Sequence, residues 1–244
     1  MVVVCVLSAA CVGPPRSADW SEAAWDALTD ASVWAPAAGA GLFLLDDFDQ
    51  RATAWAVDHQ PLFGSTDSAK GFSDRSAIGL GLFAGLSLFA VDHDAHPTIL
   101  ERDGVIALTA LVGPGQLKNI IRRERPNEND KDSMPSGHAT SSFAFASMVS
   151  HDLDRMPMLE GKDGAKAGLR ALVYTVASAS SWARVEAERH HPSDILLGAA
   201  LGNFLTAFVN NLYAADHGGS GTSQLSAFVV PAAEQWVVGA HWRF

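Results

Sequence analysis

Two adjacent histidines and an aspartate stand close together in the segment AERHHPSD. His190 precedes Asp194 by four residues and His191 precedes it by three, with a proline between. A carboxylate that accepts the Nδ1–H of a histidine fixes the tautomer whose Nε2 is free to attack an electrophile. The segment therefore offers a nucleophile and its orienting acid. It equally suits a charged loop in which Ser193 or Asp194 caps the helix that follows the proline.

A second group of residues is cationic. Of the 17 Lys and Arg residues, five lie between Lys118 and Lys131, in and after the segment KNIIRRERP. Lys118 and Arg125 are seven residues apart, so on one helix ending at Pro126 they would lie on nearly the same face. A guanidinium and an ammonium on one face suit the oxygens of a phosphate. Taken alone, the pattern is more typical of a solvated helix end, where basic residues are common.

The tetrapeptide PSGH, residues 135–138, stands at the start of another predicted helix. Ser136 is a candidate N-cap, and backbone N–H groups at such a helix start bind anions. His138 would lie in the first turn, where its ring could give a proton to a leaving group. By itself, the tetrapeptide also suits a capped helix with an incidental histidine.

The elements that must position these residues are predicted to be helical. Apolar residues recur at helical spacing in most of the chain, and no alternation of strands and helices is present. Residues 19–34 form the first such segment, and Pro36 with the glycines after it is expected to interrupt it. The sequence therefore predicts an all-α fold of about six or seven helices. The remaining segments are 41–64, 75–94, 103–126, 136–150, 169–188 and 192–213.

The C-terminal tail, residues 217–244, has a different pattern. Trp236, Val238, Ala240, Trp242 and Phe244 alternate with the residues between them, which is typical of a strand. The sequence predicts a short β-hairpin packed on the helical domain, which we place at residues 18–216.

Composition limits the function classes. A net charge of −10 argues against a nucleic-acid partner. Hydrophobic residues make up 48% of the chain, but its mean hydropathy is only +0.10. The apolar runs are mostly shorter than the roughly 20 residues that span a bilayer. We therefore favour a compact helical domain with a very apolar core over a polytopic membrane protein.

The first 17 residues are predicted to be a leader for export. They are apolar at first and then abruptly polar, as in a shortened secretory signal. Cys5 and Cys11 are the two cysteines of the chain, so neither staples the core nor forms a metal-type motif. The segment LSAAC loosely matches a lipoprotein cleavage site, with Cys11 as the lipidated residue. An ordinary signal peptide and a misassigned start codon are the alternatives.

The three groups together follow the patterns K-x6-R-P, P-S-G-H and R-x5-H-x3-D in that order, the last beginning at Arg184. In this the chain resembles the type 2 phosphatidic acid phosphatase (PAP2) superfamily, which includes bacterial class A acid phosphatases and vanadium haloperoxidases. The motifs cover residues 118–194. The resemblance implies a PAP2-type helical bundle and a metal-independent phosphatase with no cofactor.

The resemblance also implies a role for each residue. His190 would attack phosphorus and form a phosphohistidine, and Asp194 would orient it. His138 would protonate the leaving oxygen and then activate water. His191 would be packing or pocket wall. The residues that would hold the phosphoryl oxygens are Lys118, Arg125, Ser136, Gly137 and Arg184.

The implied substrate is the terminal phosphate of an envelope lipid, such as undecaprenyl diphosphate or phosphatidic acid, at a membrane surface with the active site on the periplasmic side. The alternatives are a soluble-substrate acid phosphatase, a haloperoxidase that binds vanadate in the same cradle, and a non-catalytic envelope protein. Arg122 and Arg123 are extra cations that are either solvated or attract an anionic membrane. His93 and His96 suit a polar loop as well as a metal site.

Overall fold

The computed structural model describes residues 19–92, 96–128, 130–214, 224–232 and 235–243. The leader with Cys5 and Cys11, and His93, lie outside these residues. Eight α-helices are present in the described part of the chain, one or two more than expected. They are α2 (Trp20–Thr29), α3 (Ala31–Phe43), α4 (Phe48–His59), α5 (Thr66–Ser87), α6 (His96–Ile121), α7 (Gly137–Asp152), α8 (Asp163–Glu186) and α9 (Pro192–Ala214).

Two helix boundaries differ from the sequence expectation. The first predicted helix is broken at Asp30, whose side chain caps α3 by accepting a hydrogen bond from the Ser32 N–H at 2.8 Å. Pro36 does not interrupt the segment and lies inside α3. The helix expected to reach Pro126 ends instead at Ile121, because Arg122 takes a left-handed conformation with φ 51°. The loop after Ile121 is therefore longer than predicted.

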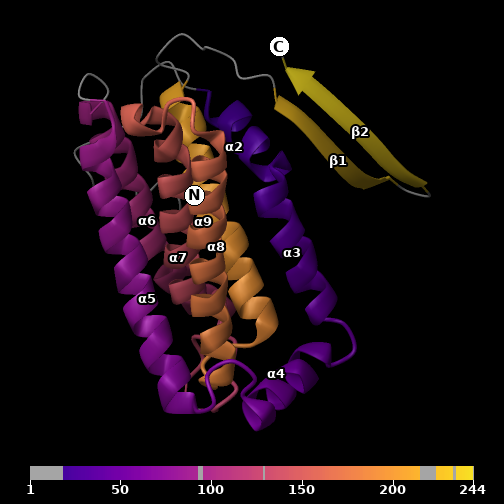
Figure 1. Ribbon diagram of the computed structural model, residues 1–244. Coiled ribbons are helices and arrows are strands. Elements are labelled where there is room, and N and C mark those ends of the chain that lie inside the picture. The colour runs from indigo at the N-terminus through magenta and orange to yellow at the C-terminus, as the bar shows by residue number, and fades with distance from the viewer. Residues whose placement is uncertain (1–18, 93–95, 129, 215–223, 233–234, 244) are drawn as a thin grey trace.

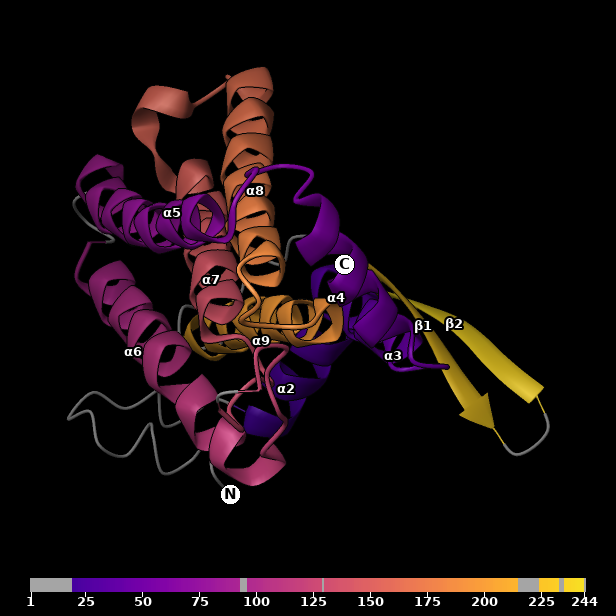
Figure 2. The ribbon, with the colours of Figure 1, turned by 90° about the horizontal axis from the view of Figure 1, so that it is seen from below.

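Helix α7 is the centre of the bundle. It packs against α5, α6, α8 and α9, and the end-on view shows it surrounded by them (Figure 2). Most of its side chains are small and buried, among them Ala139, Ala144 and Ala146 at 0% exposure. Small side chains let the neighbouring helices approach closely. The position of this helix is consequently fixed from four directions.

The contact between α7 and α9 is the tightest in the bundle. A Cβ added to Gly198 would lie 2.7 Å from the Ser136 carbonyl oxygen, and one added to Gly202 would lie 2.9 Å from the Ala144 nitrogen. Both glycines therefore lie against backbone, which cannot yield as a flexible side chain does. The two helices run in the same direction, since Gly198 faces the start of α7 and Gly202 faces its next turns.

Charged side chains are buried far from the start of α7, near its C-terminal end. Arg102 of α6 pairs with Asp103 at 2.6 Å and with Asp152 of α7 at 2.7 Å. Asp152 also accepts a hydrogen bond from Ser87 of α5 at 2.8 Å. This network joins three helices at one end of the bundle and leaves the other end to the motif residues.

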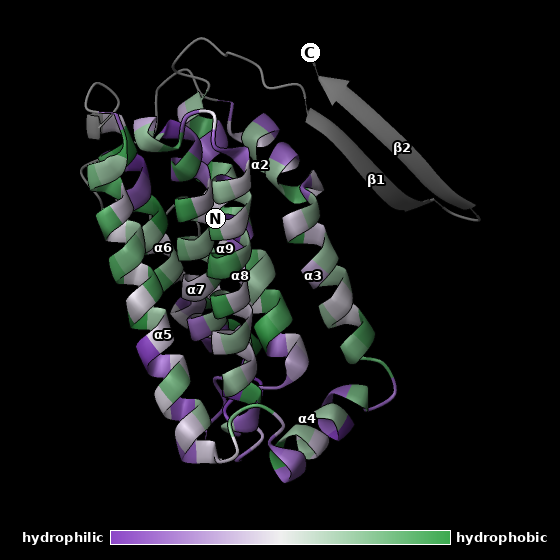
Figure 3. Cartoon of the chain, in the orientation of Figure 1, coloured by the Kyte–Doolittle hydropathy of each residue, from purple (hydrophilic) through white to green (hydrophobic). Residues whose placement is uncertain are grey.

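Apolar residues predominate in the second half of α5 and along much of α6, whereas the first half of α5 is largely hydrophilic (Figure 3). Exposed large side chains follow each other along both helices, and α6 and α9 are long and apolar enough to cross a membrane. Helix α9 is largely buried, as a core helix would be, but α6 is mostly exposed. The expectation of a compact apolar core does not account for this exposed surface. The exposed residues include Ile78, Leu82, Leu86, Phe89, Leu100, Leu108 and Leu111.

Near the C-terminus, β1 (Gln224–Ala232) pairs antiparallel with β2 (Gln235–Arg243). The helical region alone carries the fold. The packing of a C-terminal hairpin on the helical domain is not supported by this fold. It stays a prediction, as do the domain boundaries.

We predict that Gly202→Ala lowers the free energy of unfolding by about 1–3 kcal/mol, because the added methyl group forces α9 away from α7. Thermal unfolding in detergent measures this. The control is Gly85→Ala in α5, where an added Cβ meets no atom within 4 Å. That substitution should be neutral or stabilise by up to about 1 kcal/mol. Equal unfolding midpoints for the two variants would contradict the close packing.

Candidate active site

The three motifs meet at one end of the bundle, at the lower end in Figure 1 beside α4. Helix α6 ends there at Ile121 and α8 ends at Glu186, while α7 begins at Gly137 and α9 begins at Pro192. Residues separated by more than 70 positions in the sequence are thereby brought together. Helix α5 adds a residue that was not expected, Asp74.

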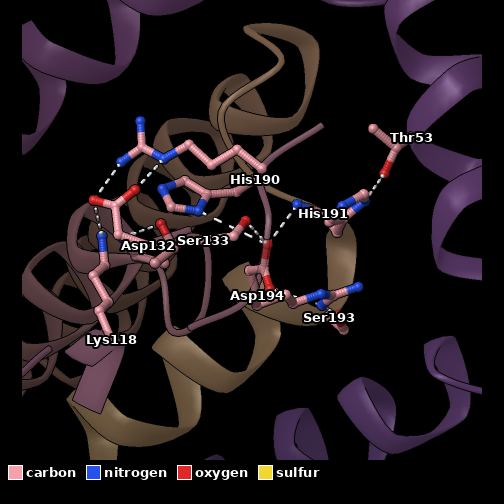
Figure 4. Close-up of polar contacts among 12 residues, drawn as sticks. Thr53, Lys118, Asp132, Ser133, His190, His191, Ser193 and Asp194 are labelled. Atoms are coloured by element: carbon pink, nitrogen blue, oxygen red, sulfur yellow. Dashed lines mark hydrogen bonds and ion pairs between the residues drawn. The ribbon is translucent and has the colours of Figure 1, made fainter. Parts of the chain in front are cut away.

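Lys118 and Arg125 meet around a carboxylate. Lys118 is in the last turn of α6, but Arg125 is in the loop beyond it, so the prediction that both lie on one helical face is wrong. They converge because both pair with Asp132. The Arg125 Nε and Nη2 atoms lie 2.7 and 2.9 Å from its oxygens, and the Lys118 Nζ lies 3.8 Å from Oδ2 (Figure 4).

The start of α7 has the expected cap. The Ser136 hydroxyl accepts a hydrogen bond from the Ala139 N–H at 3.4 Å, and the Ser136 N–H donates to the Asp194 carbonyl at 3.0 Å. Gly137 follows as the first helical residue. The second of these hydrogen bonds joins the start of α7 to the first turn of α9.

His138 and Arg184 share a partner on α5. The His138 Nε2 lies 2.9 Å from the Asp74 Oδ1, and the Arg184 Nη1 donates to the same oxygen at 3.3 Å. Burial lowers the pKa of His138, the Arg184 charge lowers it further, and the Asp74 hydrogen bond opposes both. Burial also lowers the pKa of Arg184 to about 10, so it stays charged at neutral pH. The third cation of the expected cradle is thus present and paired.

His190 is 2% exposed and faces the cations. Burial holds its pKa well below the ordinary value, and the charges of Lys118, Arg184 and Arg125 lower it further. The ring is therefore neutral at neutral pH, with a lone pair available. Lys118 and Arg184 also lower the pKa of His138, so the same two charges act on both histidines.

Asp194 joins several segments through one buried carboxylate. Its Oδ2 accepts hydrogen bonds from the Ser133 hydroxyl at 2.5 Å and from the His191 N–H at 2.8 Å. The His190 Nδ1 lies 3.9 Å from the same oxygen, which is longer than a hydrogen bond. Such catalytic contacts often tighten only when substrate binds. The spacing of four residues does bring the two side chains together.

Arg123 is neither solvated nor turned toward a membrane. Its Nη1 pairs with Asp194 Oδ1 at 2.8 Å, and its Nη2 pairs with Asp49 Oδ2 of α4 at 2.6 Å. Asp49 is 1% exposed and also accepts hydrogen bonds from the backbone and hydroxyl of Ser193. The sequence interpretation of Arg123 was therefore wrong, because its partners lie more than 70 residues away in both directions.

His191 points away from the cations. Its Nδ1 lies 2.9 Å from the Thr53 hydroxyl of α4, and Figure 4 shows the ring on the opposite side of the chain from His190. Burial and the Arg123 charge lower its pKa. The ring is positioned to hold α4 against the site.

A groove of ≈ 650 Å³ opens beside His138. Its walls come from α5, α6 and α7 and are mainly apolar, so a chain that leaves the site past His138 would meet hydrocarbon side chains. In the described ranges, no group of three or more His, Cys, Asp or Glu side chains is placed to hold a metal ion. The lining residues are Asp74, Ala77, Ile78, Gly81, Leu82, Leu111, Gly137, His138, Ser141 and Phe145.

Sequence reasoning missed all the acidic partners of the site except Asp194. Asp74 stood among other polar and charged residues in the first half of α5, and Asp132 stood in a loop with several other acids. Asp49 carries no spacing signal at all. Asp74 is followed directly by Arg75, so its sequence neighbours suggested a local partner and gave no sign of the contacts with His138 and Arg184.

Comparisons with known proteins identify the family and the fold. The family model described as PAP2 superfamily matches residues 104–217, which include all three motifs. The crystal structure of the first transmembrane PAP2 type phosphatidylglycerolphosphate phosphatase from Bacillus subtilis aligns with a TM-score of 0.54 at 20% identity. The alignment covers 70% of this chain and 88% of that one, a likeness of fold. A comparison with curated proteins gave no match.

We predict that Asp74→Asn moves the basic limb of the kcat–pH profile to lower pH, by about one unit. The carboxylate raises the pKa of His138, so its loss leaves less of the protonated imidazole at neutral pH. Phosphate release measured across pH would show a fall of about tenfold near neutrality and partial recovery in acid. Asp67→Asn, on the same helix and exposed, is the matched control. An unmoved limb would contradict the role of Asp74.

We predict that Arg123→Ala lowers the free energy of unfolding by about 3–5 kcal/mol, because it leaves two buried carboxylates without their cation. Denaturant unfolding in detergent, with phosphate release as a second readout, measures the effect. The neighbouring Arg122 is exposed, so Arg122→Ala should change neither. Similar stability of the two variants would show that the Arg123 pairs contribute little.

Proposed function

Because the chain belongs to the PAP2 superfamily and is a phosphatase of that superfamily, we propose that it hydrolyses the terminal phosphate of an envelope lipid through a phosphohistidine intermediate. The observation that carries this proposal is the convergence of three cations on one buried, neutral histidine. Lys118, Arg125 and Arg184 each lower the pKa of His190. A dianionic phosphoryl group placed among them would face a nucleophile with its lone pair free.

The first chemical step forms the phosphohistidine. His190 attacks phosphorus while the bond between phosphorus and the lipid oxygen breaks, and His138 gives its proton to the departing oxygen. The imidazole ring of His190 gains positive charge, which the Asp194 carboxylate balances from its position beside Nδ1. The three cations stabilise the charge on the phosphoryl oxygens throughout, so the residues themselves supply what phosphoryl transfer requires.

The second step releases phosphate. Water attacks phosphorus, the phosphorus–nitrogen bond breaks, and His138 accepts a proton from the water. His190 returns to its neutral state and His138 is ready to act as an acid again. The hydrogen bond from His138 to Asp74 at 2.9 Å supports this double role, because it opposes the burial that would keep the ring neutral.

A lipid phosphate is the substrate class that the surroundings support. The leaving oxygen must lie beside His138, and the groove there is lined mainly by apolar side chains of α5, α6 and α7. The exposed apolar faces of α5 and α6 suit a bilayer, and the aligned Bacillus subtilis protein is a transmembrane phosphatidylglycerolphosphate phosphatase. We place the enzyme in the envelope membrane. Export, a periplasmic active site and lipidation of Cys11 stay predictions.

We predict that His190→Ala abolishes phosphate release, whereas His191→Ala retains at least about a tenth of it, since only the first ring faces the cations. The assay uses a detergent-dispersed panel of undecaprenyl diphosphate, phosphatidic acid, phosphatidylglycerol phosphate and lipid A, with EDTA present. Release that survives EDTA supports a reaction driven by the side chains alone.

Three results would contradict the proposal. An inactive His191→Ala with an active His190→Ala would reverse the assignment of the nucleophile. Loss of release in EDTA would contradict the metal-independent mechanism. Release from soluble phosphate esters but from no lipid would favour a soluble-substrate acid phosphatase.

A further inference from the structure

The cradle proposed for phosphate already holds an anion of the chain itself. The Asp132 carboxylate lies between Lys118 and Arg125, and its two oxygens face the two cations at 2.7 to 3.8 Å (Figure 4). Its two oxygens contact a guanidinium side-on, much as two oxygens of a phosphate would. No spacing in the motifs pointed to this residue.

The cations are fixed in place, whereas the carboxylate is able to leave. The side chains of Lys118 and Arg125 are 16% and 12% exposed, but that of Asp132 is 45% exposed. The next residue, Ser133, is held by its N–H to the Arg123 carbonyl at 3.0 Å and by its hydroxyl to Asp194. A rotation of the Asp132 side chain toward solvent therefore empties the cradle without moving the backbone.

Asp74, the other acid beside the cradle cations, differs from Asp132 in its contacts. Asp74 contacts Arg184, but it also contacts His138, the residue that transfers protons in the proposed mechanism. Within the described residues, Asp132 pairs with Lys118 and Arg125, the cations that would bind phosphate, and with no proton-transferring group. A phosphoryl dianion cannot share Lys118 and Arg125 with a carboxylate at contact distance, because like charges repel strongly there.

We propose that Asp132 is a resident counter-anion that substrate phosphate displaces from Lys118 and Arg125, and that returns to expel product phosphate. This inference rests on the proposed function, because it takes the three cations to be the phosphate cradle. Asp132 thereby sets the affinity of the site for the phosphoryl group and limits inhibition by the product. It is a positioning residue of the cradle and does not touch the reacting atoms.

The test is the affinity for inorganic phosphate, measured by calorimetry on the full-length protein in detergent. Asp132→Asn should bind phosphate at least about tenfold more tightly than wild type, because the competing charge is gone. Its turnover of lipid phosphate should also be inhibited at correspondingly lower phosphate concentration. Asp132→Glu keeps the charge and should retain the affinity of the wild type.

Asp130→Asn is the matched control. Asp130 is in the same loop and carries the same charge, but its carboxylate only approaches Arg125, at 4.0 Å, and is 58% exposed. It should bind phosphate as wild type does, which separates displacement from a general loss of negative charge. Circular dichroism and unfolding midpoints identify any variant that fails to fold, and in that case Asp132→Ser replaces Asp132→Asn.

The possible failures are distinguishable. Equal phosphate affinity of the wild type, Asp132→Asn and Asp130→Asn would overturn this inference while leaving the phosphatase proposal intact. Weaker binding by Asp132→Asn would show instead that Asp132 only holds Arg125 in place. Phosphate binding by none of the proteins, together with no lipid hydrolysis, would overturn the proposed function and this inference with it.

Discussion

The buried carboxylate of Asp194 is the interaction on which the site depends. It is 0% exposed, and burying a charge in this way is costly unless every oxygen has partners. Arg123 supplies the cation, while the Ser133 hydroxyl and the His191 N–H supply hydrogen bonds. Each of these partners belongs to a loop that also carries a motif residue. Satisfying one buried charge therefore fixes the loops that carry Arg125, His190 and the start of α7.

The second constraint is the direct contact of α7 with α9. Gly198 and Gly202 remove the side chains that would keep the two backbones apart, so Ser136 and Asp194 meet through a backbone hydrogen bond at 3.0 Å. The tight packing transmits the position of one helix to the other. His138 on α7, the proposed acid–base residue, and the loop ahead of α9 are thus held by the same rigid core, which suits a reaction that needs reacting groups in fixed positions.

The fold class was predictable from helical periodicity, and the three motifs contain the residues that the folded chain brings to one end of the bundle. The sequence did not predict what neutralises the cations. Asp74, Asp132 and Asp49 reach the site from α5, a loop and α4, and no fixed interval links them to the motifs. The prediction that Lys118 and Arg125 share one helical face was wrong for a related reason, because the left-handed conformation of Arg122 ends α6 early. Hydrophobic periodicity predicts neither the pairing of residues far apart in the sequence nor the conformation of a single backbone residue.

The parallel packing of α7 and α9 has an electrostatic consequence. Both helices direct their N-terminal ends, each equivalent to roughly half a positive elementary charge, toward the same small volume. Asp194 lies in the first turn of α9, so the field of that helix acts on its carboxylate. In the proposed mechanism, the field of α7 acts on the phosphoryl oxygens bound near Gly137. Part of the attraction proposed for phosphate would thus come from peptide units, which neither titrate with pH nor disappear when a single cationic side chain is replaced.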